Sequence, residues 1–375
     1  MRSRQASFMA ARGESRIRRR RRRRQQLARW LAAGAVAAAL AACASISEPP
    51  QGVRSAIDRG QERRIDRLVG HGREADVAVA YFDLASGANL LRNERKRFHA
   101  ASTMKVPVMF AAFEAVERGE MALDQPIPLR NEFHSLVDGS PFRLAAEDDG
   151  DPDLYAALGG ARPLSELIRR MIVRSSNLAT NLLIERIGAS RVSDLMRRLG
   201  AYEIQVLRGV EDEKAYKAGF NNTVTAYDLM LVLRAIAESA RPAPAALAGD
   251  AAADQPPGGS GSGGGAGLPG AAGASGEPGD PGSNLERVVS ARSARAMLDI
   301  LEAQEFNEKI PAGLPPGTVV AHKTGDIAGV HHDAAIVYPP GAAPYVLVVL
   351  TSGFADEKAA NRLIAEISRA IWLGR

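Results

Sequence analysis

The sequence predicts an α+β protein in which an antiparallel sheet, built from both ends of the folded region, is flanked by helices and carries an inserted all-helical lobe. Strand-like segments occur in residues 76–93 and again in 318–352. Between them, apolar residues recur at helical spacing over about residues 111–239. Strands from distant segments can share one sheet, so the helical region between them is expected to form its own lobe.

The predicted sheet begins with a hairpin. Residues 76–84 (DVAVAYFDL) and 88–93 read as strands on either side of the turn-like Ala85-Ser86-Gly87. Further strands are predicted at 318–323, 334–338 and 345–352.

Seven segments have the spacing or the apolar content of helices. They are residues 106–116, 164–173, 177–187, 192–199, 225–239, 293–303 and 357–372. Gly119 is a plausible stop for the first. Residues 131–162 show no sustained period and many turn formers, so they are predicted to be a long loop with short helical pieces.

The charge of the chain is unevenly distributed. The net charge is +5, but residues 1–42 hold twelve arginines against one acid, Glu14, which gives this segment +11 and leaves −6 for the remainder. With 46 % hydrophobic residues in 375, the remainder can bury a sizeable core. A mildly acidic mature protein argues against nucleic acid as a partner.

The N-terminal segment has the form of an export signal. An Arg-rich stretch leads into residues 30–42 (WLAAGAVAAALAA), an apolar run too short to span a bilayer comfortably. The run ends Leu40-Ala41-Ala42-Cys43, which resembles the lipobox of bacterial lipoproteins. This resemblance implies that residues 1–42 are a signal peptide and that Cys43, the only cysteine, is lipidated. We therefore expect an exported, membrane-anchored protein that faces the periplasm or the cell exterior.

Two segments of polar or small residues are predicted to lie outside the packed core, one before the domain and one within it. Residues 43–60 are predicted to be a tether, and residues 61–375 a single large domain. Within that domain, residues 240–283 are rich in Pro, Gly, Ala and Ser and are predicted to be a disordered insertion.

Three short motifs follow one another in the chain. Ser102-Thr103-Met104-Lys105 is an S-x-x-K at the head of a predicted helix, where a spacing of three places hydroxyl and amine on one face. Ser175-Ser176-Asn177 precedes a helix, and Lys323-Thr324-Gly325 ends a strand. Order and context resemble the S-x-x-K, S-D-N and K-T-G set of class A β-lactamases and penicillin-binding proteins.

This resemblance implies a β-lactamase-like sandwich and a role for each motif. Ser102 would be the acylated nucleophile, Lys105 its proton acceptor or a charge that orients one, and Ser175 a proton relay to the leaving nitrogen. The remaining motif residues would bind substrate, and the oxyanion would lie between two backbone N–H groups, those of Ser102 and Asp326. The implied substrate-binding residues are Asn177, Lys323, Thr324, Gly325 and Asp326.

Deacylation requires a carboxylate that activates water. The loop LRGVEDEKAYKAGFNNTVTA offers Glu211, Asp212 and Glu213, with Arg208 shortly before. The resemblance favours Glu211 as the fourth catalytic residue. The alternatives are that one of the other two acids serves, or that all three form a solvated turn.

The chain departs from the family pattern at three places. Ser176 stands where the family usually has an Asp that buttresses the loop, and Asp326 places a carboxyl where a small or neutral residue is usual, so it is expected to repel a substrate carboxylate. No Arg lies in residues 345–352, where many relatives have one.

Neither a cofactor nor a metal ion is implied. His331 and His332 are adjacent on a predicted strand, so their side chains should point to opposite faces and not share one ion. The expected partners are a small amide or β-lactam substrate and, through the anchor, a membrane; we expect a monomer.

Three functions remain open. Hydrolysis of β-lactams is the first expectation, and a D-alanyl-D-alanine peptidase or another serine amidase of the same fold is the second. A non-catalytic envelope lipoprotein that binds ligands through the same fold is the third.

Overall fold

The computed structural model describes residues 57–70, 75–241 and 288–375, and the following account concerns these residues. The predicted signal peptide, Cys43 and the tether up to residue 56 lie outside them, as do residues 242–283 of the predicted insertion. In the part of the chain described, no helix has both the length and the apolarity needed to cross a membrane.

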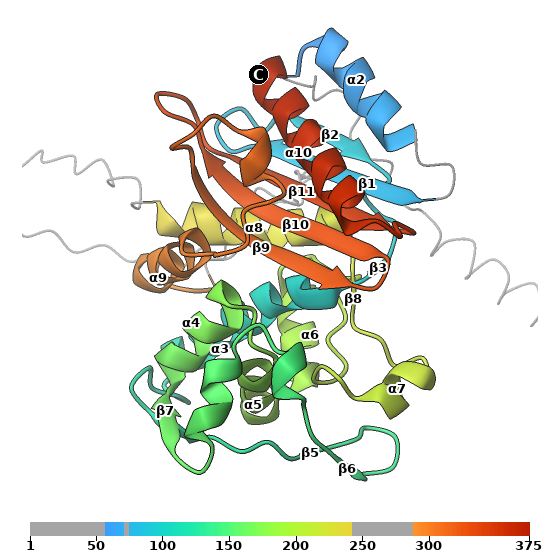
Figure 1. Ribbon diagram of the computed structural model, residues 1–375. Helices are drawn as coiled ribbons and strands as arrows, with labels where there is room; N and C mark the ends of the chain where they lie inside the picture. The colour runs from blue at the N-terminus through green and yellow to red at the C-terminus, as the bar shows by residue number, and fades with distance from the viewer. Residues whose placement is uncertain (1–56, 71–74, 242–287) are drawn as a thin grey trace, which may run out of the picture. The chain divides into compact units, whose positions relative to one another are not determined.

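A five-stranded antiparallel sheet joins the two ends of the folded region (Figure 1). Its order is β2-β1-β11-β10-β9. The early strand β1 pairs with β11 from Asp76↔Ser352 to Asp83↔Tyr345, which confirms the predicted sheet. The strands are β1 (Asp76–Asp83), β2 (Asn89–Arg92), β9 (Val319–Ile327), β10 (Val330–Tyr338) and β11 (Tyr345–Ser352).

Strands β9 and β10 extend beyond the predicted ranges. Residues 324–326 (TGD) and 331–333 (HHD) interrupt the apolar pattern, but their backbones continue the ladder, with Gly325 opposite His332. Gly329 turns between the strands at a φ of 75°. The K-T-G motif therefore lies inside an edge strand rather than at its end.

Helices cover both faces of the sheet (Figure 1). Side chains alternate along β1: one set packs with α2 (Arg59–Gly70) and α10 (Glu357–Gly374), the other with α8 (Ala226–Ala240) and α9 (Ala291–Glu302). Helix α2 is mostly charged and buries only Ile65 fully, which explains why its sequence gave no clear signal. It begins at Arg59, within the last two residues of the predicted tether.

The inserted lobe is helical, as predicted, but it is shorter than the predicted 111–239, because the helix expected at 225–239 is α8, which packs on the sheet and on α9. Its helices are α3 (Lys105–Glu117), α4 (Leu164–Val173), α5 (Asn177–Ile187), α6 (Ala189–Arg198) and the short α7 (Glu213–Lys217). Helix α3 starts before residue 111, the predicted beginning of the lobe, and every residue from Lys105 to Ala115 is buried. Because α3 is buried along most of its length, it fixes the position of Lys105 at its N-terminus.

Short elements connect the lobe to the sheet. The single-turn helix η1 (Ala101–Met104) leads into α3, and β3 (Phe98–His99) pairs with β8 (Thr223–Val224). The long loop 131–162 contains the short helices η2 (Ala146–Asp148) and η3 (Pro152–Ala157). Short pairs join β5 (Phe133–His134) to β6 (Pro141–Phe142), and β4 (Pro126–Pro128) to β7 (Ala161–Pro163). A further short helix, η4 (Pro311–Gly313), precedes β9.

Candidate active site

Ser102 lies where η1 meets the edge strand β9. A Cβ added to Gly325 would come within 3.1 Å of the Ser102 backbone N and 3.0 Å of the Thr103 N. Only glycine lets β9 approach this closely. The preceding residue, Ala101, has a φ of 45°, an unusual conformation for a residue with a side chain.

Two histidines stabilise the turn at Ala101 through hydrogen bonds. The Ala101 N–H donates to His99 Nδ1 over 3.1 Å. His332 Nε2 donates to the His99 carbonyl over 2.9 Å, and His332 Nδ1 accepts from the Thr351 N–H. Burial lowers the pKa of His332 to about 4, which keeps it neutral and suited to both bonds. The sequence gave no indication of this support.

The Lys105 amine joins the first and second motifs. Its Nζ donates to the Ser175 carbonyl over 2.6 Å, to Ser175 Oγ over 3.1 Å and to Asn177 Oδ1 over 2.8 Å. Lys323 Nζ, from the third motif, donates to the same Ser175 Oγ over 3.1 Å. The three motifs are therefore brought together around one serine hydroxyl.

Both amines are fully buried, and this determines their protonation. Burial lowers the pKa of Lys105 to about 7, while the negative charges of Asp149 and Glu211 oppose the shift. Burial and the nearby charge of Lys105 also lower the pKa of Lys323. An amine with a pKa near neutrality can accept a proton at physiological pH.

The second motif has an unusual backbone. Ser175 has a φ of 57°, in the left-handed region. The next residue, Ser176, caps α5, because its side chain accepts from the Ala179 N–H over 3.2 Å. Ser175 is thus held out of the helix at a defined position, facing the two lysines.

Asn177 links the Lys105 amine to Glu211. Its Nδ2 donates to Glu211 Oε1 over 2.6 Å, while its Oδ1 accepts from Lys105. One turn further along α5, Asn181 bonds both the N–H and the carbonyl of Val210. Two amides on one face of α5 therefore fix the residue before Glu211 and Glu211 itself.

The loop that carries Glu211 is closed at its base. Asn222 accepts from the Leu207 N–H over 2.8 Å and donates to the Arg208 carbonyl over 3.1 Å. Arg208 donates from Nε to the Phe220 carbonyl and from Nη1 to the Gly209 carbonyl, each over 2.8 Å. These contacts give the loop a defined conformation, in which Glu211 and Glu213 are exposed and Asp212 is buried.

The three consecutive acids have three different environments. Glu211 is exposed at the surface but its carboxylate points toward Asn177, and partial desolvation there raises its pKa. Asp212 caps α7 and accepts from Ser135 Oγ and the Leu136 N–H. Glu213 is exposed and pairs with Lys217. Of the three acids, Glu211 is the one that hydrogen-bonds a residue of the three motifs, Asn177.

On β9, alternate side chains serve opposite faces of the sheet. Lys323 and Gly325 face the helical lobe, whereas Thr324 and Asp326 share the other face with their neighbours on β10. Asp326 accepts from Lys309 Nζ over 2.8 Å and lies 2.9 Å from His331 Nδ1. Its charge is thus paired on the face away from Lys323, which corrects the expectation of an unpaired, repelling carboxyl.

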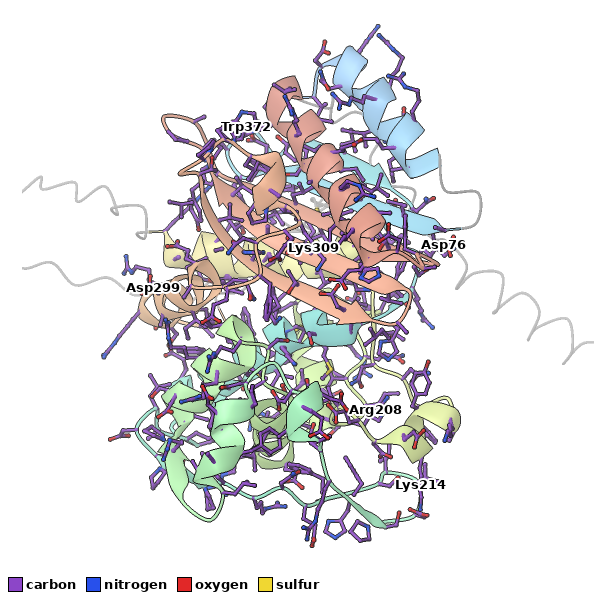
Figure 2. The ribbon with its side chains drawn as sticks, in the orientation of Figure 1. Asp76, Arg208, Lys214, Asp299, Lys309 and Trp372 are labelled. Atoms are coloured by element: carbon purple, nitrogen blue, oxygen red, sulfur yellow. The ribbon has the colours of Figure 1, made fainter. Side chains whose placement is uncertain are left out.

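Figure 2 shows Lys309, the partner of Asp326, over the sheet, and Arg208, at the base of the Glu211 loop, in the lobe.

His331 and His332 do point to opposite faces of the sheet, the first to Asp326 and the second to His99. The predicted separation of the two imidazoles is therefore present.

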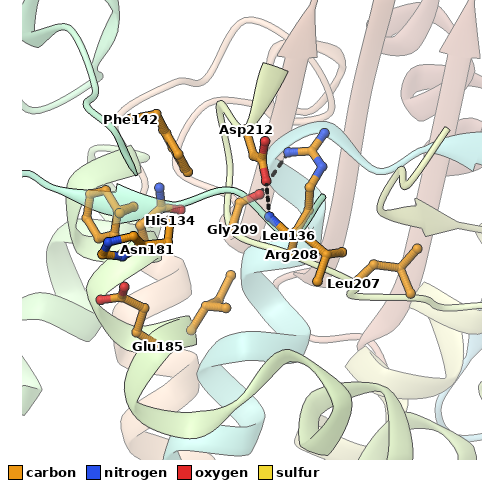
Figure 3. Close-up of a pocket in the computed structure, with 11 residues that line it drawn as sticks. His134, Leu136, Phe142, Asn181, Glu185, Leu207, Arg208, Gly209 and Asp212 are labelled. Carbon is orange, nitrogen blue, oxygen red and sulfur yellow. Dashed lines mark hydrogen bonds between the residues drawn. The ribbon is translucent and has the colours of Figure 1, made fainter. Parts of the chain in front are cut away.

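A small pocket lies behind the Glu211 loop (Figure 3). It has a volume of about 140 Å³ and is lined by residues of the 133–142 hairpin, the outer part of α5 and residues 207–212. Glu211 and the motif residues are not among its lining residues, so it is separate from the site around Ser102.

One buried carboxylate at the site was not found from the sequence. Asp149, in the loop between η2 and η3, accepts from the backbone N–H groups of Asn177 and Leu178. Its position in a turn-rich segment gave no signal for this contact.

Comparison with known proteins finds β-lactamases among the relatives of this chain. A β-lactamase of Streptomyces fradiae is 25 % identical over 350 residues, which cover 92 % of this chain and 95 % of the relative. A β-lactamase of Bacillus amyloliquefaciens is 45 % identical over 65 residues, 17 % of this chain and 21 % of the relative.

Solved structures share the fold. PBP-A has a TM-score of 0.61 and 24 % identity, covering 84 % of this chain and 95 % of its own. A β-lactamase from Sphaerobacter thermophilus has a TM-score of 0.60 and 25 % identity, covering 84 % and 96 %. Residues 61–247 and 284–373 match the model of the beta-lactamase enzyme family, and because this match spans most of the chain, the protein belongs to that family.

Proposed function

We propose that this protein is a serine β-lactamase that opens the β-lactam ring through an acyl-enzyme on Ser102. The observation that carries the proposal is the buried amine of Lys105, which contacts Ser175 Oγ and, through Asn177, is connected to Glu211. A nucleophile, a base of suitable pKa, a proton relay and a carboxylate are the parts that acylation and deacylation require.

In acylation, the neutral Lys105 amine gives up one of its three contacts with Ser175 and Asn177, and its lone pair takes the proton of Ser102 Oγ as that oxygen attacks the lactam carbonyl. The oxyanion lies between the backbone N–H groups of Ser102 and Asp326. The C–N bond then breaks and the nitrogen receives the proton of Ser175 Oγ, while Ser175 takes over the proton that Lys105 received from Ser102, which returns the amine to its neutral form.

In deacylation, Glu211 removes a proton from water, which attacks the Ser102 ester. The proton returns to Ser102 as the C–O bond breaks, and the product leaves as an opened acid. Asn177, together with Lys323 and Gly325 on the lobe-facing side of β9, is proposed to bind the substrate, whereas the side chain of Thr324 lies on the other face of the strand. The contact between Asn177 and Glu211 favours a β-lactamase over a peptidase, because it places a carboxylate at the site.

Time-resolved intact mass spectrometry with benzylpenicillin tests this function. We expect an adduct with the full mass of the penicillin that forms and decays while opened penicillin accumulates. Ser102→Ala should show no adduct, whereas Ser165→Ala, a matched change at an exposed serine, should behave as the wild type. A persistent adduct would indicate a peptidase, and no adduct with no turnover would exclude both enzymes.

We also propose that the protein is exported and lipidated at Cys43, on the basis of LAAC at the end of the apolar run. Metabolic labelling with a radioactive fatty acid should mark the wild-type chain and should not mark Cys43→Ala. Cys43→Ser, which also lacks the thiol, is expected to remain unlabelled as well. Label retained in either variant would contradict lipidation at this residue.

A further inference from the structure

Asp149 is a buried carboxylate beside the second motif, 28 residues away from it in the chain. It is 7 % exposed. Its Oδ1 accepts from the Asp151 N–H over 2.9 Å, and its Oδ2 accepts from the Leu178 N–H over 2.8 Å and from Tyr155 Oη over 2.9 Å. Both oxygens lie 3.0 Å from the Asn177 N, so every neighbour is a donor.

Only a carboxylate satisfies all these donors. The first N–H groups of an α-helix have no partner within the helix, and the helix dipole favours a negative charge there. Ser176 supplies a side-chain partner for Ala179, and Asp149 supplies one for Asn177 and Leu178. An asparagine in place of Asp149 would turn an NH₂ group toward these donors.

The residues after Asp149 hold the other side of Ser175. A Cβ on Gly150 would lie 2.0 Å from the Arg174 carbonyl oxygen, so this segment rests directly on the backbone before Ser175. Asp151, fully buried, pairs with Arg170 over 2.7 Å and with Arg174 over 2.8 Å. Residues 149–151 therefore contact the backbone or side chains both before and after Ser175, whose φ is in the left-handed region.

We propose that Asp149 is a positioning residue for the reaction: it fixes the start of α5, and thereby the Asn177 amide between Lys105 and Glu211. Among the described residues, the side chain of Ser176 accepts only from the Ala179 N–H, so the N–H groups of Asn177 and Leu178 depend on this carboxylate. The inference rests on the proposed function only in that the fixed amide serves acylation and deacylation.

The carboxylate also acts on Lys105 through its charge. The charged groups that affect this amine are Asp149 and Glu211, which stabilise the ammonium form, and Lys323, which opposes it. Neutralising Asp149 therefore lowers the pKa of Lys105. A residue with a purely structural role at this distance from the amine would leave the pKa of Lys105 unchanged.

The test compares Asp149→Asn with Asp153→Asn, the same substitution at an exposed position of the same segment. We expect D149N to acylate with benzylpenicillin roughly 10- to 100-fold more slowly, as for loss of hydrogen bonds to a charged acceptor, and its pH profile to shift to lower pH. D153N should match the wild type. If D149N does not fold, Tyr155→Phe removes one donor to Asp149 and should show a smaller loss in the same direction.

A crystal structure of D149N provides a readout independent of activity. We expect the Asn177 amide to lose its contact with Lys105 or with Glu211. An unchanged amide together with a wild-type rate, or a slower rate without a pH shift, would overturn the inference. If the wild type itself forms no adduct, the proposed function fails, and the position of Asn177 in the D149N crystal still decides the role of Asp149.

Discussion

Replacing Glu211 by glutamine is expected to slow deacylation by roughly 10²- to 10⁴-fold, the usual contribution of a general base, and to leave acylation largely intact. Glutamine keeps the size of the side chain and can still accept from Asn177 Nδ2 over the 2.6 Å contact. It cannot take a proton from water. Steady turnover of benzylpenicillin should become a single burst, and the acyl-enzyme on Ser102 should accumulate in the mass spectrum.

The matched control for this experiment is Glu213→Gln. Glu213 lies two residues away, is exposed and pairs only with Lys217 among the contacts of the described residues, so its substitution should leave turnover unchanged. Turnover of the Glu211→Gln enzyme at the wild-type rate would exclude Glu211 as the base. Asp212 would be a poor substitute, because its carboxylate is occupied by Ser135, Leu136 and Ala215.

The same substitution should change the pH dependence of acylation. The negative charge of Glu211 favours the ammonium form of Lys105, and its loss lowers the pKa of that amine. The acid limb of the acylation profile should therefore move to lower pH in Glu211→Gln. An acid limb at the wild-type position would show that the two groups are not coupled.

Much of the fold follows from local patterns. Helices α4 and α5 and strand β11 have the predicted bounds, because an amphipathic or continuously apolar segment with clear end signals is decided by its own residues. The ends of β9 and β10 were missed because Asp326, His332 and Asp333 are polar residues inside strands. Their side chains bond to Lys309, His99 and Ile310 on other segments, and the periodicity of the sequence does not register such contacts.

The candidate site likewise has residues that local motifs identify and residues that only contacts between distant segments identify. The motifs identify Ser102, Lys105, Ser175 and Lys323, since their spacing and order are local features. The choice among Glu211, Asp212 and Glu213 depends on Asn177 and Asn181, which come from a helix about 30 residues earlier. Asp149, His99 and His332 were missed for this reason too: each acts through a contact that only the folded chain creates.

Replacing Lys105 by methionine is expected to lower the acylation rate by roughly 10²- to 10⁴-fold, because methionine has similar length but no group that accepts the Ser102 proton. In the wild type, the rate should rise with pH and level off above about 7, where the buried amine has lost its proton. Below that pH the ammonium form has no lone pair, so the rate should fall about tenfold per pH unit. This limb should be absent in Lys105→Met.

Stability should change in the opposite sense to activity. The amine of Lys105 is fully buried, and its desolvation disfavours the charged form. Replacing it by an apolar side chain removes this cost, although Ser175 and Asn177 lose a donor, so we expect a melting temperature at or above that of the wild type. Lys217→Arg, at an exposed position on α7, is the control and should retain both rate and pH profile. A Lys105→Met enzyme that keeps the wild-type pH limb would assign the base to another group, with Glu211 the next to test.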